Sequence, residues 1–204
     1  MMKKIISILV CLLLILSVGI YYYIHQPKNI FDEIYQETER TYRTNNILRK
    51  IDGVDVHSVW PRDSEYLKYS PHATYKKNVS GDYHNIVLGF NFQNIEQTSF
   101  IRFDKYINSF VKVRIRVRYN YSEKILTKNL EIILGKGDSD KYIEDETQVR
   151  SYLKKYGITA KDLDAYYEKI VNQKVLKDWC SIYKSKYSPK DYGQVTVKTQ
   201  WEKW

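Results

Sequence analysis

The sequence predicts an α+β protein in which an N-terminal transmembrane anchor precedes an antiparallel β-sheet, with helices packed on one face of the sheet and the other face open. Three observations predict this fold. An uncharged stretch lies near the N-terminus, four consecutive segments alternate apolar and polar residues as strands do, and two amphipathic helical segments follow them. Because strands place alternate side chains on opposite faces, a single layer of helices can cover the apolar face.

The segment from Ile5 to Ile24, IISILVCLLLILSVGIYYYI, has about the 20 residues that a helix needs to cross a bilayer. Lys3 and Lys4 precede it, and three tyrosines end it, as is common at membrane interfaces. No A-x-A cleavage site follows, so residues 1–27 predict a retained anchor rather than a removed signal peptide. The apolar stretch before Cys11 is too short for a lipoprotein signal.

The short basic head before the apolar core predicts that residues 28–204 form one extracytoplasmic α+β domain, held at the cell membrane by a single span. Outside the span only Cys180 remains, so no intramolecular disulfide can form, which is typical of a Gram-positive cell surface. Lys and Arg number 33 against 24 Asp and Glu, a balance that would suit nucleic acid. An exported domain does not meet the chromosome, so no nucleic-acid partner is expected.

The elements of the domain follow from local patterns. Asn29 predicts the N-cap of a helix over residues 30–50, with Asp32 and Glu33 in its first turn. Alternation predicts strands over residues 54–60, 84–92, 99–107, 111–121 and 125–134, the last four forming an antiparallel meander. A helix over residues 144–157, a second helix opened by a capping box at Thr159 and Asp162, and a final strand over residues 194–201 complete the domain.

The strand VKVRIRVRYNY carries the most distinctive pattern. Its apolar residues share the face predicted to be core, whereas four cations, which we call the basic row, share the other: Lys112, Arg114, Arg116 and Arg118. We predict that the basic row is exposed to solvent and forms a partner-binding surface with Thr127, Asn129, Glu131 and Lys198 on neighbouring strands. The alternative is a solvated sheet face that binds nothing.

The acidic stretch GDSDKYIEDE provides an alternative partner-binding surface, formed by Asp138, Asp140, Glu144 and Asp145. It lacks the central Gly and the final Glu of an EF-hand loop, so no metal site is expected. The sequence contains no G-x-S-x-G, H-E-x-x-H or Gly-rich phosphate loop, and we therefore expect neither an enzyme nor a cofactor. Its 20 tyrosines favour recognition, because Tyr offers a large apolar face and a polar tip.

The anchor running into NIFDEIYQETE, the Tyr-rich β region and the closing LKDWCSIYKSKYSPKDYGQVTVKTQW resemble the TipC family of streptococcal immunity proteins. The resemblance implies an α+β fold whose antiparallel sheet exposes one concave face. It also implies an outward-facing membrane protein that binds and neutralises an LXG-type toxin, which a type VII secretion system exports and which attacks the wall precursor lipid II.

The expected partners are therefore a cognate LXG-type toxin and, through residues 5–24, the membrane, with a monomeric ectodomain. The alternative function is a cell-surface module whose basic sheet face binds teichoic acid or anionic lipid headgroups. The two functions differ in their dependence on salt, because binding to a polymer or lipid by scattered cations weakens steeply with ionic strength.

Overall fold

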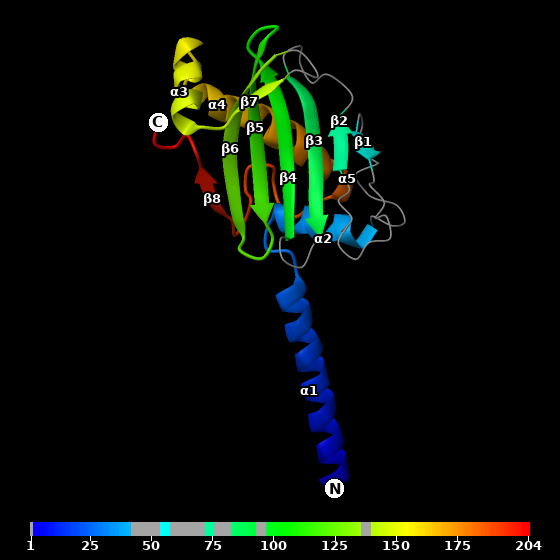
Figure 1. Cartoon of the computed structure of the whole chain (residues 1–204). Coiled ribbons are helices and arrows are strands. Elements are labelled where there is room, and N and C mark those ends of the chain that lie inside the picture. Colours follow the sequence, from blue (N-terminus) through cyan, green and yellow to red (C-terminus); the bar gives the residue numbers. More distant parts are fainter. Residues whose placement is uncertain (1, 42–53, 58–71, 76–82, 93–96, 136–139) are drawn as a thin grey trace, which may run out of the picture.

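The computed structural model describes residues 2–41, 54–57, 72–75, 83–92, 97–135 and 140–204. It contains a long N-terminal helix, a sheet and a layer of helices on one side of that sheet (Figure 1). In chain order the elements are α1 (Met2–His25), α2 (Ile30–Thr41), β1 (Val54–His57), β2 (His72–Tyr75), β3 (Tyr83–Phe92), β4 (Gln97–Tyr106), β5 (Val111–Asn120), β6 (Ile125–Leu134), β7 (Lys141–Ile143), α3 (Glu146–Lys155), α4 (Ala160–Tyr167), the π-helical segment η3 (Glu168–Leu176), α5 (Lys177–Tyr183) and β8 (Thr196–Thr199).

Helix α1 projects away from the rest of the molecule (Figure 1). Its stretch Lys4–His25 is 22 residues long and entirely exposed, and its length and composition would allow it to cross a membrane. A signal sequence near an N-terminus shares these properties. The predicted apolar N-terminal segment is therefore a candidate membrane anchor that forms a continuous helix.

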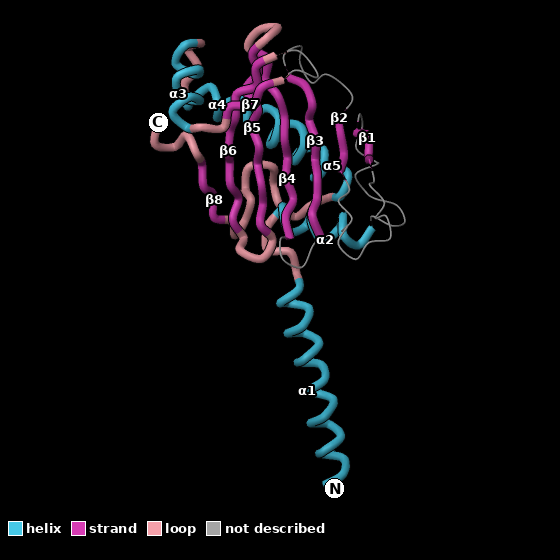
Figure 2. The backbone as a smooth tube through the Cα atoms, in the orientation of Figure 1, coloured by secondary structure: helices cyan, strands magenta, loops and turns pink. Residues whose placement is uncertain are grey.

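The strands form one sheet in the order β1-β2-β3-β4-β5-β6-β7, and every neighbouring pair in this order is antiparallel. Strand β8 pairs with β6 in parallel, beside Ile125 to Lys128, whereas β7 pairs with β6 beside Ile132 to Leu134. These two short strands thus share the outer edge of β6. Short turns at residues 107–110 and 121–124 join β4 to β5 and β5 to β6, as the alternating pattern predicts, and Figure 2 shows α4 and α5 behind these strands.

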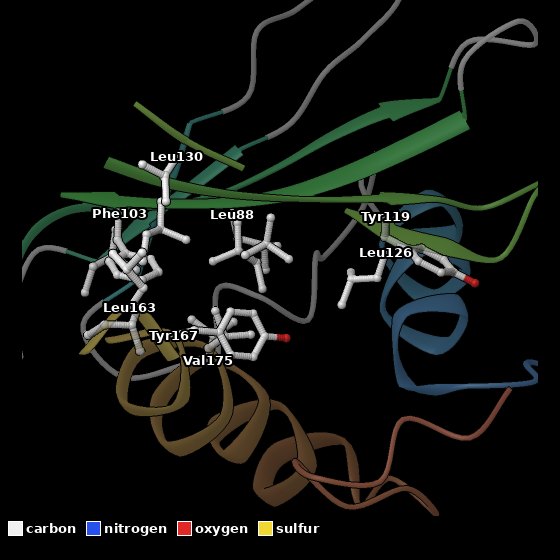
Figure 3. Close-up of a cluster of buried hydrophobic side chains, with 14 of the residues drawn as sticks. Leu88, Phe103, Tyr119, Leu126, Leu130, Leu163, Tyr167 and Val175 are labelled. Carbon is white, nitrogen blue, oxygen red and sulfur yellow. The ribbon is translucent and has the colours of Figure 1, made fainter. Parts of the chain in front are cut away.

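The core lies between the sheet and the helices. In Figure 3, Leu88, Phe103 and Leu130 point from the strands toward Leu163 and other residues of the helical layer. Burying a large apolar side chain contributes about 1.5–3 kcal/mol, so this single layer of contacts is the main source of stability. The largest fully buried side chains of the described residues include Trp179 and Trp201 from the C-terminal part of the chain.

The structure confirms the α+β fold with a half-covered antiparallel sheet and corrects several boundaries. Helix α2 begins after Asn29 as predicted, and the predicted end, residues 42–50, lies outside the described residues. Strands β2 and β7 were not predicted, because each is too short to show an alternating pattern. The capping box at Thr159 and Asp162 is present, and Gly157 takes the left-handed conformation (φ 66°) that ends a helix.

Candidate binding surface

The two faces of β5 separate apolar from basic side chains, as the sequence predicts. Val113 and Ile115 are completely buried against the helical layer, which confirms them as core residues. The basic row therefore lies on the face of the sheet that the helices leave uncovered, with the register of β4 and β6 on either side fixing its neighbours.

The expectation that all four cations are exposed is wrong for the first two. Lys112 and Arg114 retain only 5 % and 8 % of their accessible surface, whereas the Arg116 side chain is 40 % exposed and Arg118 is exposed. The basic row thus divides into a buried pair and an accessible pair along one strand. The reason lies in the carboxylates that surround its first half.

Arg114 is held by carboxylates from both neighbouring strands. Its Nε and Nη2 donate to the two oxygens of Asp104 at 2.5 and 2.9 Å, and its Nη1 lies 3.5 Å from Glu131. Asp104 on β4 and Glu131 on β6 are its register partners. Burial alone would lower the pKa of Arg114, but the hydrogen bonds and charge of Asp104 outweigh it and raise the pKa. The guanidinium is therefore a permanently charged, fully paired buried group.

Lys112 is neutralised in a similar way by a residue that follows β6. Its Nζ donates to Asp140 at 2.7 Å and lies 5.5 Å from the centre of the Tyr106 ring. Burial acts to lower the pKa of this lysine, and the hydrogen bond to Asp140 raises it above the ordinary value. Its register partner on β6, Ile133, is fully buried although it faces away from the helices. We call Lys112, Arg114 and their three carboxylate partners the ion-paired end.

Arg116 and Arg118 lie in different surroundings. Arg116 donates to Glu131 at 3.2 and 3.3 Å, so it shares a carboxylate that Arg114 also contacts. Among the described residues, Arg118 forms no ion pair. Positive charge is thus balanced at the first half of the row and in excess at the second.

Arg102 on β4 adds a further cation to this second half. It is the register partner of Arg116, it is half-buried, and its Nε is buried without a hydrogen-bond partner in the described part of the chain. Burial lowers the pKa of Arg102, and the positive charges of Arg114 and Arg116 lower it further. An anionic group from outside would relieve this repulsion.

The register arranges the accessible residues in two rows across the strands. Arg118 on β5, Thr127 on β6 and Lys198 on β8 are successive partners, and Arg116 lies between Arg102 and Asn129. Arg118, Asn129 and Lys198 are exposed, and Thr127 is half-buried. We call this surface the open end; it comprises Phe100, Arg102, Arg116, Arg118, Thr127, Asn129 and Lys198.

Two hollows mark the open end. One, of about 330 Å³, is lined by Arg116, Arg118, Asn120, Glu123, Ile125, Thr127 and Asn129. The other, of about 230 Å³, is lined by Arg116, Asn129, Leu130, Glu131, Glu144 and Gln200. Both are shallow and polar, and Arg116 and Asn129 border both, which fits contact with another macromolecule better than enclosure of a small ligand.

Phe100 gives the open end an aromatic contact. It is the register partner of Gly89 on β3, and a Cβ atom added to Gly89 would lie 2.2 Å from the Phe100 ring. The Phe100 ring therefore packs directly on the backbone of Gly89, where any side chain would collide with it. Phe100 remains half-exposed beside Arg118, its partner on β5.

The structure places the predicted site residues in different environments. Arg116, Arg118, Thr127, Asn129 and Lys198 come together at the open end, whereas Lys112, Arg114 and Glu131 are buried in ion pairs. Of the acidic alternative, Asp138 lies outside the described residues, Asp140 pairs with Lys112, Glu144 is exposed beside Glu131, and Asp145 caps α3 by accepting from Gln148. The three acidic residues that the structure describes are therefore occupied in different ways, as an ion pair, as a neighbour of Glu131 and as a helix cap.

Sequence reasoning missed three residues of this face: Phe100, Arg102 and Asp104. A signal for them was present, because β4 and β5 form a hairpin whose register places Asp104 opposite Arg114 and Arg102 opposite Arg116. Counting back across the turn at residues 107–110 would have paired the first arginine with a carboxylate and the second with another cation.

Comparison with known proteins agrees with this architecture. A family model described as TipC immunity protein-like matches residues 2–200. The solved structure of TipC2 from Streptococcus intermedius B196 is 63 % identical in sequence, with a TM-score of 0.82, and the match covers 88 % of this chain and 99 % of that one. No curated protein sequence matches. Since the family model spans nearly the whole chain, this protein belongs to the TipC immunity protein-like family.

Proposed function

We propose that this protein is a membrane-anchored, extracellular immunity protein that binds and neutralises a cognate LXG-type toxin exported by a type VII secretion system and acting on lipid II. Residues 1–27 would form the anchor and residues 28–204 the toxin-binding domain. Membership of an immunity protein family makes the chain a binding protein and not an enzyme. The toxin and its target enter the proposal through the resemblance to the TipC family.

The observation that carries the proposal is the open end. It presents Arg102, Arg116 and Arg118 on two paired strands, together with Lys198, and among the described residues the ion pair found for these four cations is that of Arg116 with Glu131. Arginine and aromatic side chains provide much of the energy of protein interfaces. An acidic surface of a toxin would fit here and would be oriented by charge before contact.

The proposed location rests on α1. Its apolar residues are exposed along its whole length, which is unfavourable in water and favourable in a bilayer. A toxin that acts on lipid II outside the membrane would meet an inhibitor held at the same surface. Immunity would then require only binding, in a stoichiometric complex that blocks the toxin.

The test is binding of the full chain to the LXG-type toxin encoded next to it. Arg118→Glu/Lys198→Glu should fold normally, since both side chains are exposed, and should bind at least about 100-fold more weakly, because like charges across an interface cost several kcal/mol. Lys154→Glu/Lys161→Glu, the same change of charge at exposed sites on α3 and α4, is the matched control and should bind normally.

A second variant examines the acidic alternative. Glu144→Gln/Asp145→Asn removes two negative charges, and the Asn side-chain oxygen preserves the cap of α3. This variant should retain toxin binding. Loss of binding here, with full binding by Arg118→Glu/Lys198→Glu, would move the contact to the acidic residues.

Topology provides an independent test. A reporter fused after Trp204 should be active only outside the cell, and the mature protein should retain Ile5 to Ile24. Reporter activity in the cytoplasm would exclude extracellular immunity. Binding of teichoic acid that disappears with modest salt, without any toxin binding, would favour the cell-surface module instead.

A further inference from the structure

The segment formed by residues 184–194, between α5 and β8, packs against the point where the chain leaves α1. The Tyr187 hydroxyl donates to the carbonyl oxygen of Pro27 at 2.7 Å, and the Gln194 amide lies 3.3 Å from the carbonyl oxygen of Lys28. Gly193 adopts φ 69°, and a Cβ atom there would lie 2.7 Å from that same oxygen of Lys28. Glycine at position 193 thus permits close contact between the segment and the end of the anchor.

A buried polar cluster makes this junction stiff. The carboxylate of Asp32, completely buried, accepts hydrogen bonds from the Lys28 amide at 3.0 Å, from the Lys124 ammonium at 2.8 Å and from the Tyr119 hydroxyl. Asn29 donates to the Tyr119 hydroxyl at 2.8 Å. The first residues after α1 are therefore bound to β5 and to the turn that follows it, so the domain is fixed to its anchor rather than tethered by a free linker.

The segment at this junction is rich in exposed cations. Lys184, Lys186 and Lys190 are exposed, and we call them the basic collar. Lys190 lies 3.3 Å from Glu168, but its side chain is still 76 % exposed. Asp191 is the segment's single carboxylate, and its Oδ1 accepts from the Gly193 amide. The collar thus carries excess positive charge that points into the surroundings.

The position of the collar relative to α1 indicates what those surroundings are. Tyr21 to Tyr23 are exposed near the end of α1, where aromatic rings occupy the interface of a bilayer. Lys28 donates to the Tyr23 carbonyl oxygen and lies 3.9 Å from the centre of that ring. In Figure 1 α1 extends away from the end of the sheet at which β5 ends, and the hydrogen bonds of Tyr187 and Gln194 to Pro27 and Lys28 hold the segment 184–194 against the chain just after α1, on the side that would face the lipid headgroups once α1 is inserted.

We propose that Lys184, Lys186 and Lys190 bind the phosphates of anionic phospholipid headgroups and hold the strands upright on the membrane, with the uncovered face of the sheet turned sideways. Clustered cations within a Debye length of about 8–10 Å of a negatively charged bilayer are attracted to it. The inference rests on the proposed function only for insertion of α1, and it does not require toxin binding.

The experiment is hydrogen exchange of the full chain in lipid nanodiscs of phosphatidylcholine, with and without phosphatidylglycerol. Amides of residues 184–192 should exchange several-fold more slowly when phosphatidylglycerol is present, and high salt should abolish the difference. Lys184→Gln/Lys186→Gln/Lys190→Gln should lose this protection while keeping the toxin affinity of the parent protein. Lys154→Gln/Lys155→Gln/Lys161→Gln, the same loss of charge on α3 and α4, should keep the protection.

Each other outcome overturns the inference in an identifiable way. Equal exchange in both lipids, or unchanged protection in the collar variant, would exclude headgroup binding by these lysines. An equal loss of protection in the α3 and α4 variant would mean that the overall charge of the protein, and not the collar, causes the protection. Protection by soluble teichoic acid in phosphatidylcholine alone would identify a wall polymer as the ligand. Rapid exchange throughout α1 would exclude the anchor itself, whereas failure of toxin binding alone would affect only the proposed function.

Discussion

The two ends of the basic row on β5 show how the same alternating pattern can produce two different surfaces. At the ion-paired end Lys112 and Arg114 are buried with carboxylates, and at the open end Arg116 and Arg118 remain accessible. The strand itself does not explain the difference, because its sequence repeats with the same period throughout. The surrounding chain does, since β4, β6 and the residue before β7 bring carboxylates to one end, whereas neutral residues and another arginine lie beside the other.

This comparison assigns different roles to residues of one type. A buried ion pair costs desolvation that its attraction only partly offsets, so its removal as a pair is tolerated and its disruption is not. An exposed cation contributes little to stability and retains its full capacity to attract a partner. Arg114 should therefore matter for folding and Arg118 for binding, although only three residues separate them.

The largest effect should come from reversing the charge of Arg114. In Arg114→Glu the new carboxylate would be buried beside Asp104 and Glu131, and we expect a loss of about 4 kcal/mol or more in the free energy of unfolding. Urea unfolding followed by circular dichroism measures this loss. Arg118→Glu is the control on the same strand, and its stability should change by about 0.5 kcal/mol or less.

Equal stability of these two variants would contradict the division of the row. It would mean that Arg114 can leave the sheet and reach water when its pairing is lost. The buried position of Asp104, which retains none of its accessible surface, argues against such an escape.

The second largest expected change in stability comes from removing one partner of the buried ion pair, and it should be larger than the change caused by removing both partners. Asp104→Leu leaves Arg114 buried with Glu131, at the edge of hydrogen-bonding distance, as its remaining carboxylate partner among the described residues, and should cost about 3 kcal/mol. Asp104→Leu/Arg114→Met removes both charges and should recover most of that stability, because buried pairs can be replaced by apolar side chains. A double-mutant cycle in urea gives the coupling energy. Additive losses would show that the pair contributes through packing alone.

The sequence predicted the faces of β5 and failed to predict which cations are accessible. Alternation identifies the buried face, since Val113 and Ile115 must avoid water whatever their neighbours are. The accessibility of a charged residue depends on partners elsewhere in the chain. Asp104 lies across a hairpin and could have been found by counting, but Asp140 reaches Lys112 from a loop whose path no local pattern defines.

The same distinction holds for the rest of the fold. The helices near the C-terminus could be predicted from their caps and apolar spacing, as Thr159 and Gly157 show. The parallel pairing of β8 with β6 could not, because a strand of four residues carries no signal for its neighbour or direction. Lys198 joins the open end only through that pairing, so its predicted place on this surface depended on a contact distant in sequence.

A kinetic measurement would sharpen the comparison at the open end. Arg118→Gln should lower the rate of association with the toxin about 3- to 10-fold at low salt and change the dissociation rate little, because an exposed charge acts mainly by steering. Lys112→Gln/Asp140→Asn removes an ion pair that has no net charge from the ion-paired end, and it should leave the association rate unchanged. Stopped-flow mixing at two salt concentrations measures both rates. A larger effect of the second variant would place the contact at the ion-paired end.

The smallest expected effect concerns Glu131, the carboxylate that both ends share. Its pKa is raised, chiefly because burial disfavours the charged form, with Glu144 adding to the effect and Arg116 opposing it. The folded protein therefore binds this proton more tightly than the unfolded chain does. Between the ordinary pKa of 4.5 and the raised value, the free energy of unfolding should increase as the pH falls.

Glu131→Gln removes the titrating carboxyl group. The free energy of unfolding of this variant should therefore lack the part of the pH dependence that Glu131 causes. Other acids titrate in both proteins, and the difference between the two urea-unfolding curves therefore isolates Glu131. We expect this difference to move in favour of the glutamate protein as the pH falls from neutral toward 4.5, because the folded glutamate protein then binds a proton that the glutamine variant cannot bind. A difference that instead grows in favour of the glutamate as pH rises would show that Arg114 and Arg116 stabilise the charged form. The shared carboxylate would then belong wholly to the ion-paired end, and Arg116 would be as constrained as Arg114.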